Sequence, residues 1–277
     1  RLDKPSYDLK SLPRPRAYLQ ALQQALEACG LDVLQLDHED AQGQYEVNFG
    51  FDEVLSSADH LMLFKQAAFA LAEERGMVFS MMPKPFADQP GSGMHFHVSM
   101  WAGPAQDRHG NARNLFVPHR PDGSVDPMAL LSPLGRQFAA GVLAHSAALC
   151  AIAAPTVNSY KRLVVGESLS GTSWAPACIA QGPNNRTALV RTLAGRFEWR
   201  LPDASANPYL ASATLIAAGL DGIERQLPLP PEVSDEASVV ASVPDVAPEM
   251  LLDSLISKPA ARPMLPLISV ARFSEVP

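Results

Sequence analysis

Ionisable and amide side chains alternate with apolar ones along three short segments of the sequence. The two-residue period of Gln44–Phe49, Gly93–Trp101 and Arg196–Leu201 is typical of β-strands. The polar members of each segment share one face of the expected strand, and they are Gln44, Glu46 and Asn48; His95, His97 and Ser99; and Arg196, Glu198 and Arg200. Three such strands could form the charged floor of an active site. An ordinary sheet with one face in water shows the same alternation.

Four longer segments have the apolar period of helices, and these helices would hold the strands in place. They are Pro15–Cys29, Ser57–Arg75, Ser132–Ala153 and Ser205–Leu227. Gly30 and Gly76 follow the first two, where a helix commonly ends. The apolar positions are interpreted as core rather than as cofactor contacts. Residues 227–277 are rich in proline, and we expect a peripheral segment there with a short helix near Met250–Ile256.

The composition narrows the class of protein. An apolar fraction of 47% in 277 residues is enough for a sizeable core, and the net charge of -7 comes without runs of Lys or Arg. We therefore expect a soluble protein that binds no nucleic acid. No apolar stretch is expected to reach the roughly 20 residues that a membrane helix needs, so no membrane association is expected. Three widely spaced cysteines favour reduced core thiols and a cytoplasmic location.

Six ordered blocks of sequence resemble the glutamine synthetase family. They are DHEDAQGQYE (37–46), KPFADQPGSGMHFHVS (84–99), NSYKRL (158–163), NNRTALVR (184–191), RFEWR (196–200) and ASANPYL (204–210). The resemblance runs from about Tyr7 to Ile223. Within the family, LDKPSYD near the start and SGTSWAP at 170–176 are most similar to type III glutamine synthetases and γ-glutamylmethylamide synthetases.

The resemblance implies an α+β catalytic domain, with a curved antiparallel sheet flanked by helices over residues 1–277. It also implies an ATP-dependent ligase. Glutamate would be phosphorylated on its γ-carboxylate, and ammonia or a small alkylamine would then displace phosphate. Members of the family form stacked homo-oligomeric rings. The alternatives are a non-catalytic protein of the same fold and a phosphotransferase related to guanidino kinases.

Two or more Mg²⁺ or Mn²⁺ ions are implied by the same resemblance. Glu39 and Glu46 would hold one ion, and His95 with Glu198 would hold the other. Carboxylates and a neutral imidazole suit hard divalent cations that bridge phosphates. We expect the four side chains to surround two points roughly 4 to 6 Å apart.

Five arginines match positions of the family that handle anions. Arg186 and Arg200 are the candidate catalytic arginines, and Arg191 and Arg196 match the phosphate side. Arg162, like Arg200, matches a glutamate-binding position. Guanidinium groups pair their donors with phosphate and carboxylate oxygens, so we expect these side chains to have few carboxylate partners of their own.

The remaining candidates surround the nucleotide and the substrates. His97 and Ser99 would extend the metal strand towards ATP, and Phe51 would lie against the adenine. Gly91 matches a glycine whose backbone meets the amino-acid substrate. Tyr7 is assigned to the nitrogen-donor pocket.

The loop after NSYKR departs from the family pattern. Ordinary members carry a catalytic Glu there, but their spacing falls on Ser168 in this chain. Glu167 is the only acid available, and a solvated loop residue is an equal interpretation. Pro90 replaces an Asn, which makes glutamate a less secure substrate than ATP.

The first Glu-x-Glu metal strand and the N-terminal β-grasp domain of the family have no counterpart before Tyr7. We therefore expect a piece of a longer enzyme, inactive by itself, or a degenerate relative.

Overall fold

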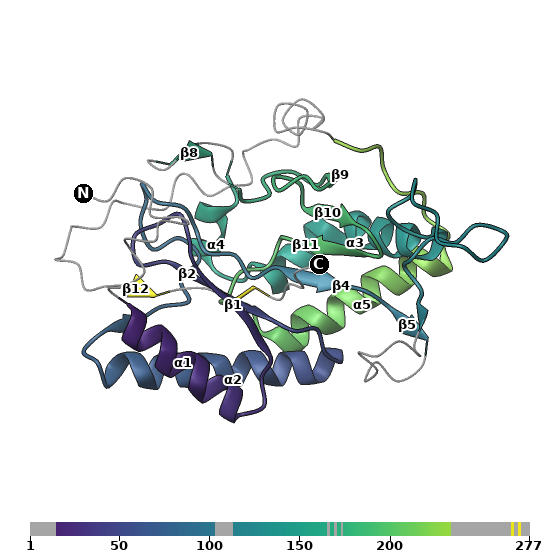
Figure 1. The fold of residues 1–277 in the computed structure, drawn as a ribbon. Coiled ribbons are helices and arrows are strands. Elements are labelled where there is room, and N and C mark those ends of the chain that lie inside the picture. The colour runs from purple at the N-terminus through teal and green to yellow at the C-terminus, as the bar shows by residue number, and fades with distance from the viewer. Residues whose placement is uncertain are drawn as a thin grey trace.

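Two helix-covered sheets lie side by side in the computed structural model (Figure 1). The structure describes residues 15–102, 113–164, 167–168, 171–172, 174–233, 267–268 and 271–272, and it gives the two-residue stretches at 167–168, 171–172, 267–268 and 271–272 by their backbone only. Its helices are α1 (Arg16–Ala28), α2 (Val54–Glu73), α3 (Pro133–Ala153), α4 (Val157–Arg162) and α5 (Pro208–Glu224). The four expected helices are thus confirmed.

The first sheet is built on a hairpin. Strands β1 (Val33–His38) and β2 (Tyr45–Phe49) pair antiparallel, with Glu46 opposite Asp37. Helices α1 and α2 cover this sheet, and their apolar faces form one core cluster with Tyr45, Val47 and Phe49. Gly43 supplies the positive φ that the turn of this hairpin requires.

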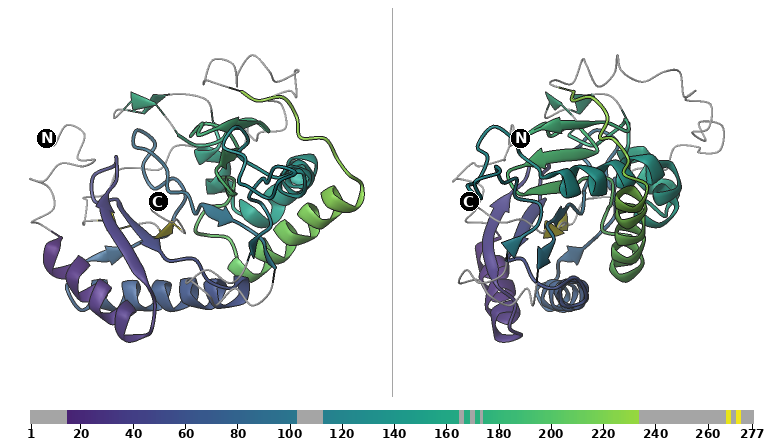
Figure 2. Two further views of the ribbon diagram at one scale, coloured as in Figure 1. Left: turned by 45° about the vertical axis from the view of Figure 1, so that its right-hand side comes forward. Right: turned by 90° about the vertical axis from the view of Figure 1, so that its right-hand side faces the viewer.

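The second sheet has the order β4-β11-β10-β9. Its strands are β4 (Phe96–Val98), β9 (Gln181–Pro183), β10 (Val190–Leu193) and β11 (Arg196–Trp199). β4, β11 and β10 pair antiparallel, whereas β9 runs parallel to β10. Helices α3 and α5 pack against this sheet around a second core cluster (Figure 2). The family fold expected from the sequence matches this mixture of helices and mainly antiparallel sheets.

Short strands complete the description. They are β3 (Val78–Phe79), β5 (Trp101–Ala102), β6 (Arg113–Asn114), β7 (Glu167–Ser168), β8 (Gly171–Thr172), β12 (Leu267–Ile268) and β13 (Ala271–Arg272). β12 pairs with β3 and β13 pairs with β2. These two short strands of the C-terminal segment thus add to sheets, β13 at the edge of the first one, and the peripheral position of the whole segment stays a prediction. The helix expected near 250–256 lies outside the described residues.

Two expectations from composition need correction. Helix α3 is long and apolar enough to cross a membrane by length and composition, although half of its most apolar window is buried inside the protein, as in a core helix. The prediction that no segment meets this criterion is wrong. Among the cysteines, Cys29 is exposed, contrary to the prediction, whereas Cys150 and Cys178 are partly buried and pack against core clusters.

Candidate functional site

A buried carboxylate with three basic partners lies on β11. Glu198 Oε1 is 3.0 Å from His95 Nδ1 and 2.5 Å from Arg200 Nη1, and Glu198 Oε2 is 2.8 Å from Arg191 Nη1. These residues come from three places: His95 precedes β4, Arg191 lies in β10, and Arg200 directly follows β11. The strand register places Glu198 opposite both Arg191 and His97. We call Glu198, His95, Arg191 and Arg200 the charged cluster.

The surroundings of Glu198 keep it ionised. Burial by itself raises the pKa of this carboxyl group, but the charge of Arg200, the hydrogen bond from His95 and the charges of His95 and His97 outweigh that effect. The pKa of Glu198 is consequently held well below its ordinary value. A carboxylate that stays ionised under its neighbours can hold cationic groups in fixed positions.

Burial decides between the two interpretations of the alternating strands. Glu198 and Arg200 are both 0% exposed, Glu46 is 6% exposed and His95 is 8% exposed. A solvated sheet face would expose these side chains, because ionised groups are rarely buried unless they have partners. The polar faces of β2 and β11 therefore lie inside the protein, as an active-site floor requires.

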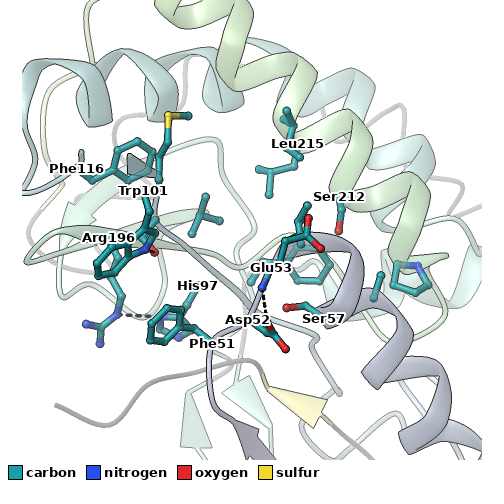
Figure 3. Close-up of a pocket in the computed structure, with 18 of the residues that line it drawn as sticks. Phe51, Asp52, Glu53, Ser57, His97, Trp101, Phe116, Arg196, Ser212 and Leu215 are labelled. Atoms are coloured by element: carbon teal, nitrogen blue, oxygen red, sulfur yellow. Dashed lines mark hydrogen bonds between the residues drawn. The ribbon is translucent and has the colours of Figure 1, made fainter. Parts of the chain in front are cut away.

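A cavity of about 430 Å³ is lined by His97, which the strand register places opposite Glu198 of the charged cluster. The rings of Phe51 and Trp101 stack in parallel at its wall, with centroids 5.6 Å apart and planes 8° apart. Arg196 Nε lies 3.3 Å from His97 Nδ1 in the same wall. Figure 3 shows these four side chains together on one side of the cavity. Ser99 also lines it, so four of the five residues predicted for ATP and its phosphates, Phe51, His97, Ser99 and Arg196, line one cavity, whereas Arg191 does not.

Most of the residues that line the cavity are apolar. Every residue from Phe96 to Trp101 lines it, so the cavity follows β4, the edge strand of the second sheet. Other apolar lining residues are Phe116, Phe138 and Leu215, and Figure 3 shows Phe116 beside Trp101. Asp52 and Glu53 line it as well, so the cavity has basic and acidic side chains next to an apolar surface suited to a flat ring.

Arg162 lies away from this cavity. It is 3% exposed, and its Nη1 and Nη2 donate to the carbonyl oxygens of Leu201 and Arg200, each at 3.0 Å. Burial lowers its pKa to about 10, an effect that Asp203 partly offsets, so Arg162 is charged at neutral pH. Its guanidinium packs under Gly93, where a Cβ atom would come within 2.5 Å of Nη2. These contacts hold Arg162 in place, and its predicted role in binding glutamate stays a prediction.

Gly91 is held close to the same arginine. A Cβ atom at this position would lie 2.7 Å from the carbonyl oxygen of Pro83 and 2.9 Å from Arg162 Cγ. Gln44 Nε2, on the β1–β2 hairpin, donates to the Gly91 carbonyl oxygen at 3.0 Å. The requirement for glycine here is explained by this packing, and the predicted contact with substrate stays a prediction.

The arginines differ in their ion-pair and hydrogen-bond partners. Arg186 is exposed, and within the residues that the structure describes it has no ion pair or hydrogen bond. Arg191 is held from two sides, since its Nε donates to Asn184 Oδ1 at 3.0 Å and its Nη1 pairs with Glu198. The expectation of few carboxylate partners holds for Arg186 and is wrong for Arg191 and Arg200.

The two predicted metal pairs lie on different sheets. Glu46 is in β2 and Glu39 directly follows β1, whereas His95 and Glu198 belong to the second sheet. Among the described residues, no group of three or more His, Cys, Asp or Glu side chains is placed to hold a metal ion. His95 and Glu198 do form a pair of suitable metal ligands, and His95 Nδ1 lies 3.0 Å from Glu198 Oε1. The convergence of all four residues stays a prediction.

Two candidates cannot be placed. Tyr7 lies outside the described residues, and only the backbone of Glu167 is described, paired with Thr172 in the β7–β8 hairpin. Directly after this hairpin, the carbonyl oxygen of Trp174 accepts a hydrogen bond from Arg200 Nη2 at 3.0 Å. The loop therefore returns to the charged cluster, and the half-exposed Trp174 stands at its rim.

Sequence reasoning missed two contributors to the site. Trp101 continues the alternation of His97 and Ser99, so the period could have identified it. Asn184 carries a positive φ of 51° and its Oδ1 accepts from Arg191. Only its place in the NNRTALVR block, two residues before Arg186, could have suggested that role.

Residues 2–255 match the family model described as glutamine synthetase, catalytic domain. The chain is 50% identical over 226 residues to a glutamate–methylamine ligase from Methyloversatilis universalis, covering 82% of this chain and 48% of the relative. It is 40% identical to a glutamine synthetase from Rhizobium meliloti, covering 80% and 48%.

Two solved structures are also similar to this chain. A GmaS–ADP complex superposes with a TM-score of 0.72 at 36% identity, covering 91% of this chain and 54% of that one. A structure of GmaS without ligand gives a TM-score of 0.70 at 35% identity, covering 93% and 53%. The chain spans about half the length of the curated relatives it matches.

Proposed function

Because the chain belongs to the glutamine synthetase family, we propose that it forms the catalytic half of an ATP-dependent ligase that joins ammonia or a small alkylamine to the γ-carboxylate of glutamate. The observation that carries this proposal is the charged cluster beside the aromatic-walled cavity. Fixed arginines next to a ring-sized apolar space suit a nucleotide whose phosphoryl group is transferred.

The cavity provides the nucleotide site. The parallel rings of Phe51 and Trp101 offer a flat apolar surface for the adenine. Arg196 and His97 stand beside them, where they would meet the phosphates. A similar protein was solved with ADP, which supports nucleotide binding by this chain.

The donor types fit a divalent cation. His95 and Glu198 would hold one ion together with substrate phosphates, because Mg²⁺ commonly takes only one or two carboxylates from the protein. Glu39 and Glu46 are assigned to a second ion. When bound, such cations neutralise phosphate charge and orient the transferred group.

The arginines act on the charge that develops during phosphoryl transfer. Glu198 holds Arg191 and Arg200 in place, so their orientation is set before substrate binds. Arg186 is free of protein partners among the described residues and can follow the γ-phosphoryl group. Donors that are positioned in advance stabilise such charge with little reorganisation.

The nitrogen donor is the finer part of the proposal. Trp174 stands at the rim of the charged cluster, and one similar protein is a glutamate–methylamine ligase, which together favour a pocket that accepts methylamine as well as ammonia. One buried methyl group contributes only about 1 kcal/mol, so we expect the two donors to differ by roughly tenfold in kcat/KM.

The test is an assay of phosphate release from ATP by the full-length protein. Glutamate is supplied with methylamine or with ammonia, at a pH where both amines are partly deprotonated. Release that requires glutamate and occurs with both donors is the expected result. A preference for ammonia of more than about a hundredfold would exceed what one methyl group supplies and would identify a glutamine synthetase instead. Release that does not require glutamate would reject the ligase.

A further inference from the structure

The loop that carries Arg186 is fastened by its neighbour Asn185. This loop connects β9 to β10, and Asn185 is buried within it at 8% exposure. Asn185 Oδ1 accepts from the Thr187 backbone N–H at 2.9 Å and from Thr187 Oγ1 at 2.7 Å. Asn185 Nδ2 donates in the other direction, to the carbonyl oxygen of Val233 at 3.0 Å. The side-chain amide of Asn185 thus links Thr187, in the same loop, to Val233.

Val233 belongs to a segment that leaves α5 and crosses β9. We call residues 227–233 the strap. Gln181 in β9 holds it twice, because Gln181 Nε2 donates to the Pro230 carbonyl oxygen at 2.8 Å and the Val233 N–H donates to the Gln181 carbonyl oxygen at 2.9 Å. The strap lies so close to β9 that a Cβ atom on Gly182 would come within 2.2 Å of the Val233 carbonyl oxygen.

We propose that Asn185 is a positioning residue, which ties the loop of Arg186 to the strap and so fixes where this arginine stands. The inference rests on the proposed function, since it assigns Arg186 to the phosphoryl group. An exposed arginine has many rotamers, and ordering it in the transition state costs free energy that a fixed backbone reduces. Within the described part of the chain Arg186 has no partner of its own. The contacts of Asn185 are therefore the nearest side-chain restraint on its backbone.

The link between the loop and the strap can be tested without an activity assay, by hydrogen exchange in the full-length protein. In Asn185→Ala, the backbone amides of both Thr187 and Val233 should exchange at least about tenfold faster. The Thr187 amide loses its hydrogen-bond acceptor, and the strap that contains Val233 loses its hydrogen bond to Asn185. Ser132→Ala is the matched control, because Ser132 Oγ also bridges two backbone groups, the N–H of Gly135 and the carbonyl oxygen of Leu115. Unchanged exchange at Val233 in Asn185→Ala would overturn the coupling.

The consequence for catalysis is tested in the full-length protein. Asn185→Ala should lower kcat by about tenfold or more while the KM values for ATP and glutamate change less than about threefold. Adding Asn185→Ala to Arg186→Ala should cause no further loss, because the positioned group is already gone. Losses that multiply in the double variant would overturn the positioning role.

A second variant loosens the strap without touching the loop of Arg186. Gln181→Leu removes the bond to Pro230 and also a buried amide oxygen that lacks a partner among the described residues, so folding should be preserved. It should lower kcat in the same way, whereas Ser132→Ala should leave kcat unchanged. Wild-type kcat in Gln181→Leu would overturn the strap's part. If wild-type protein showed no glutamate-dependent phosphate release, the proposed function would fail. Hydrogen exchange would still test whether Asn185 couples its loop to the strap.

Discussion

Glu198 is a charged side chain with no access to water, and its stability depends on its partners. Two arginines and a histidine surround its two oxygens. Removing one member of such a set leaves the other charges buried without a counter-charge. The resulting loss of folding free energy is larger than the net stabilisation that the intact set provides. The cluster therefore couples stability to the geometry of the site.

Glu198→Gln tests this coupling. The amide keeps the shape of the side chain but leaves Arg191 and Arg200 without a counter-charge, so we expect the free energy of unfolding to fall by about 3–5 kcal/mol. Urea unfolding measures the change, and the exposed Glu224→Gln serves as control, within about 0.5 kcal/mol of wild type. A loss for Glu198→Gln no larger than the control would show that the cluster is not ionised as described.

Arg186 should behave in the opposite way. It is exposed and bonded to no described residue, so Arg186→Ala should leave the free energy of unfolding within about 0.5 kcal/mol of wild type. Its kcat should fall by at least about a hundredfold, as expected when a donor to transition-state charge is lost. Steady-state kinetics in the full-length protein measure this. Normal turnover would show that Arg186 has no part in the reaction.

At the scale of elements, the crossing of α3 and α5 depends on three glycines. A Cβ atom on Gly141 would lie 2.1 Å from the Ala218 carbonyl oxygen, and one on Gly222 would lie 2.6 Å from Gly141 Cα. A Cβ atom on Gly219 would come within 2.2 Å of the Phe138 ring. The two helices therefore meet backbone to backbone, and α5 in turn forms one wall of the cavity.

Gly141→Ala should force these helices apart. Overpacking costs about 1–3 kcal/mol, and the better helix propensity of alanine recovers about 1 kcal/mol or less. We expect a net loss, seen as a lower denaturation midpoint. Ala148→Ser, on the exposed face of the same helix, should change stability by less than about 0.5 kcal/mol. A Gly141→Ala protein as stable as wild type would contradict the close crossing.

A surface pair across the same helices should make stability depend on pH. The hydrogen bond from His145, at 2.8 Å, lowers the pKa of Asp221, and Arg225 lowers it further. Because the pKa is lower in the folded state, the ionised carboxylate stabilises the protein above its unfolded pKa of about 3.9 and loses this effect as the pH falls. Asp221→Asn should destabilise the protein at pH 7 and should destabilise it less at pH 3. An equal effect at both pH values in thermal unfolding would contradict this.

Much of the secondary structure could be predicted from the sequence, because helical periodicity is local. The helices at 16–28 and 133–153 followed from it closely. β4 is shorter than expected, because residues 93–95 form the close-packed loop over Arg162 instead. β9 was missed, because a strand of the composition Gln-Gly-Pro has no alternating pattern and is defined only by its pairing with β10. β10 was missed although its burial alternates along Val190–Leu193.

The candidate site could be predicted in type but not in arrangement. Alternation placed Glu198 and Arg200 on one face, and the structure confirms that face as buried. Which arginine pairs with Glu198 depends on the register of β10 with β11, which no local pattern reveals. The buried position of Arg162 could not be foreseen either, because it depends on contacts between α4 and the distant residues Arg200 and Leu201.

On the scale of the whole molecule, the cavity lies where two cores meet. Phe96 packs against both clusters, the one under α1 and α2 and the one around α3 and α5. Residues from both sides line the cavity, among them Phe49 and Phe138. The sequence shows each core as periodic segments, but only the folded chain shows that the charged cluster stands at their junction.

The central claim is that this junction transfers a phosphoryl group to the γ-carboxylate of glutamate. The most direct measurement supplies the full-length protein with ATP, methylamine or ammonia, and glutamate carrying ¹⁸O in its γ-carboxylate, and then determines the isotope in the released phosphate. A γ-carboxylate oxygen attacks the γ-phosphorus of ATP, and the amine later displaces phosphate together with that oxygen, so each phosphate should carry one ¹⁸O atom. Phosphate released without ¹⁸O would contradict the acyl-phosphate ligase.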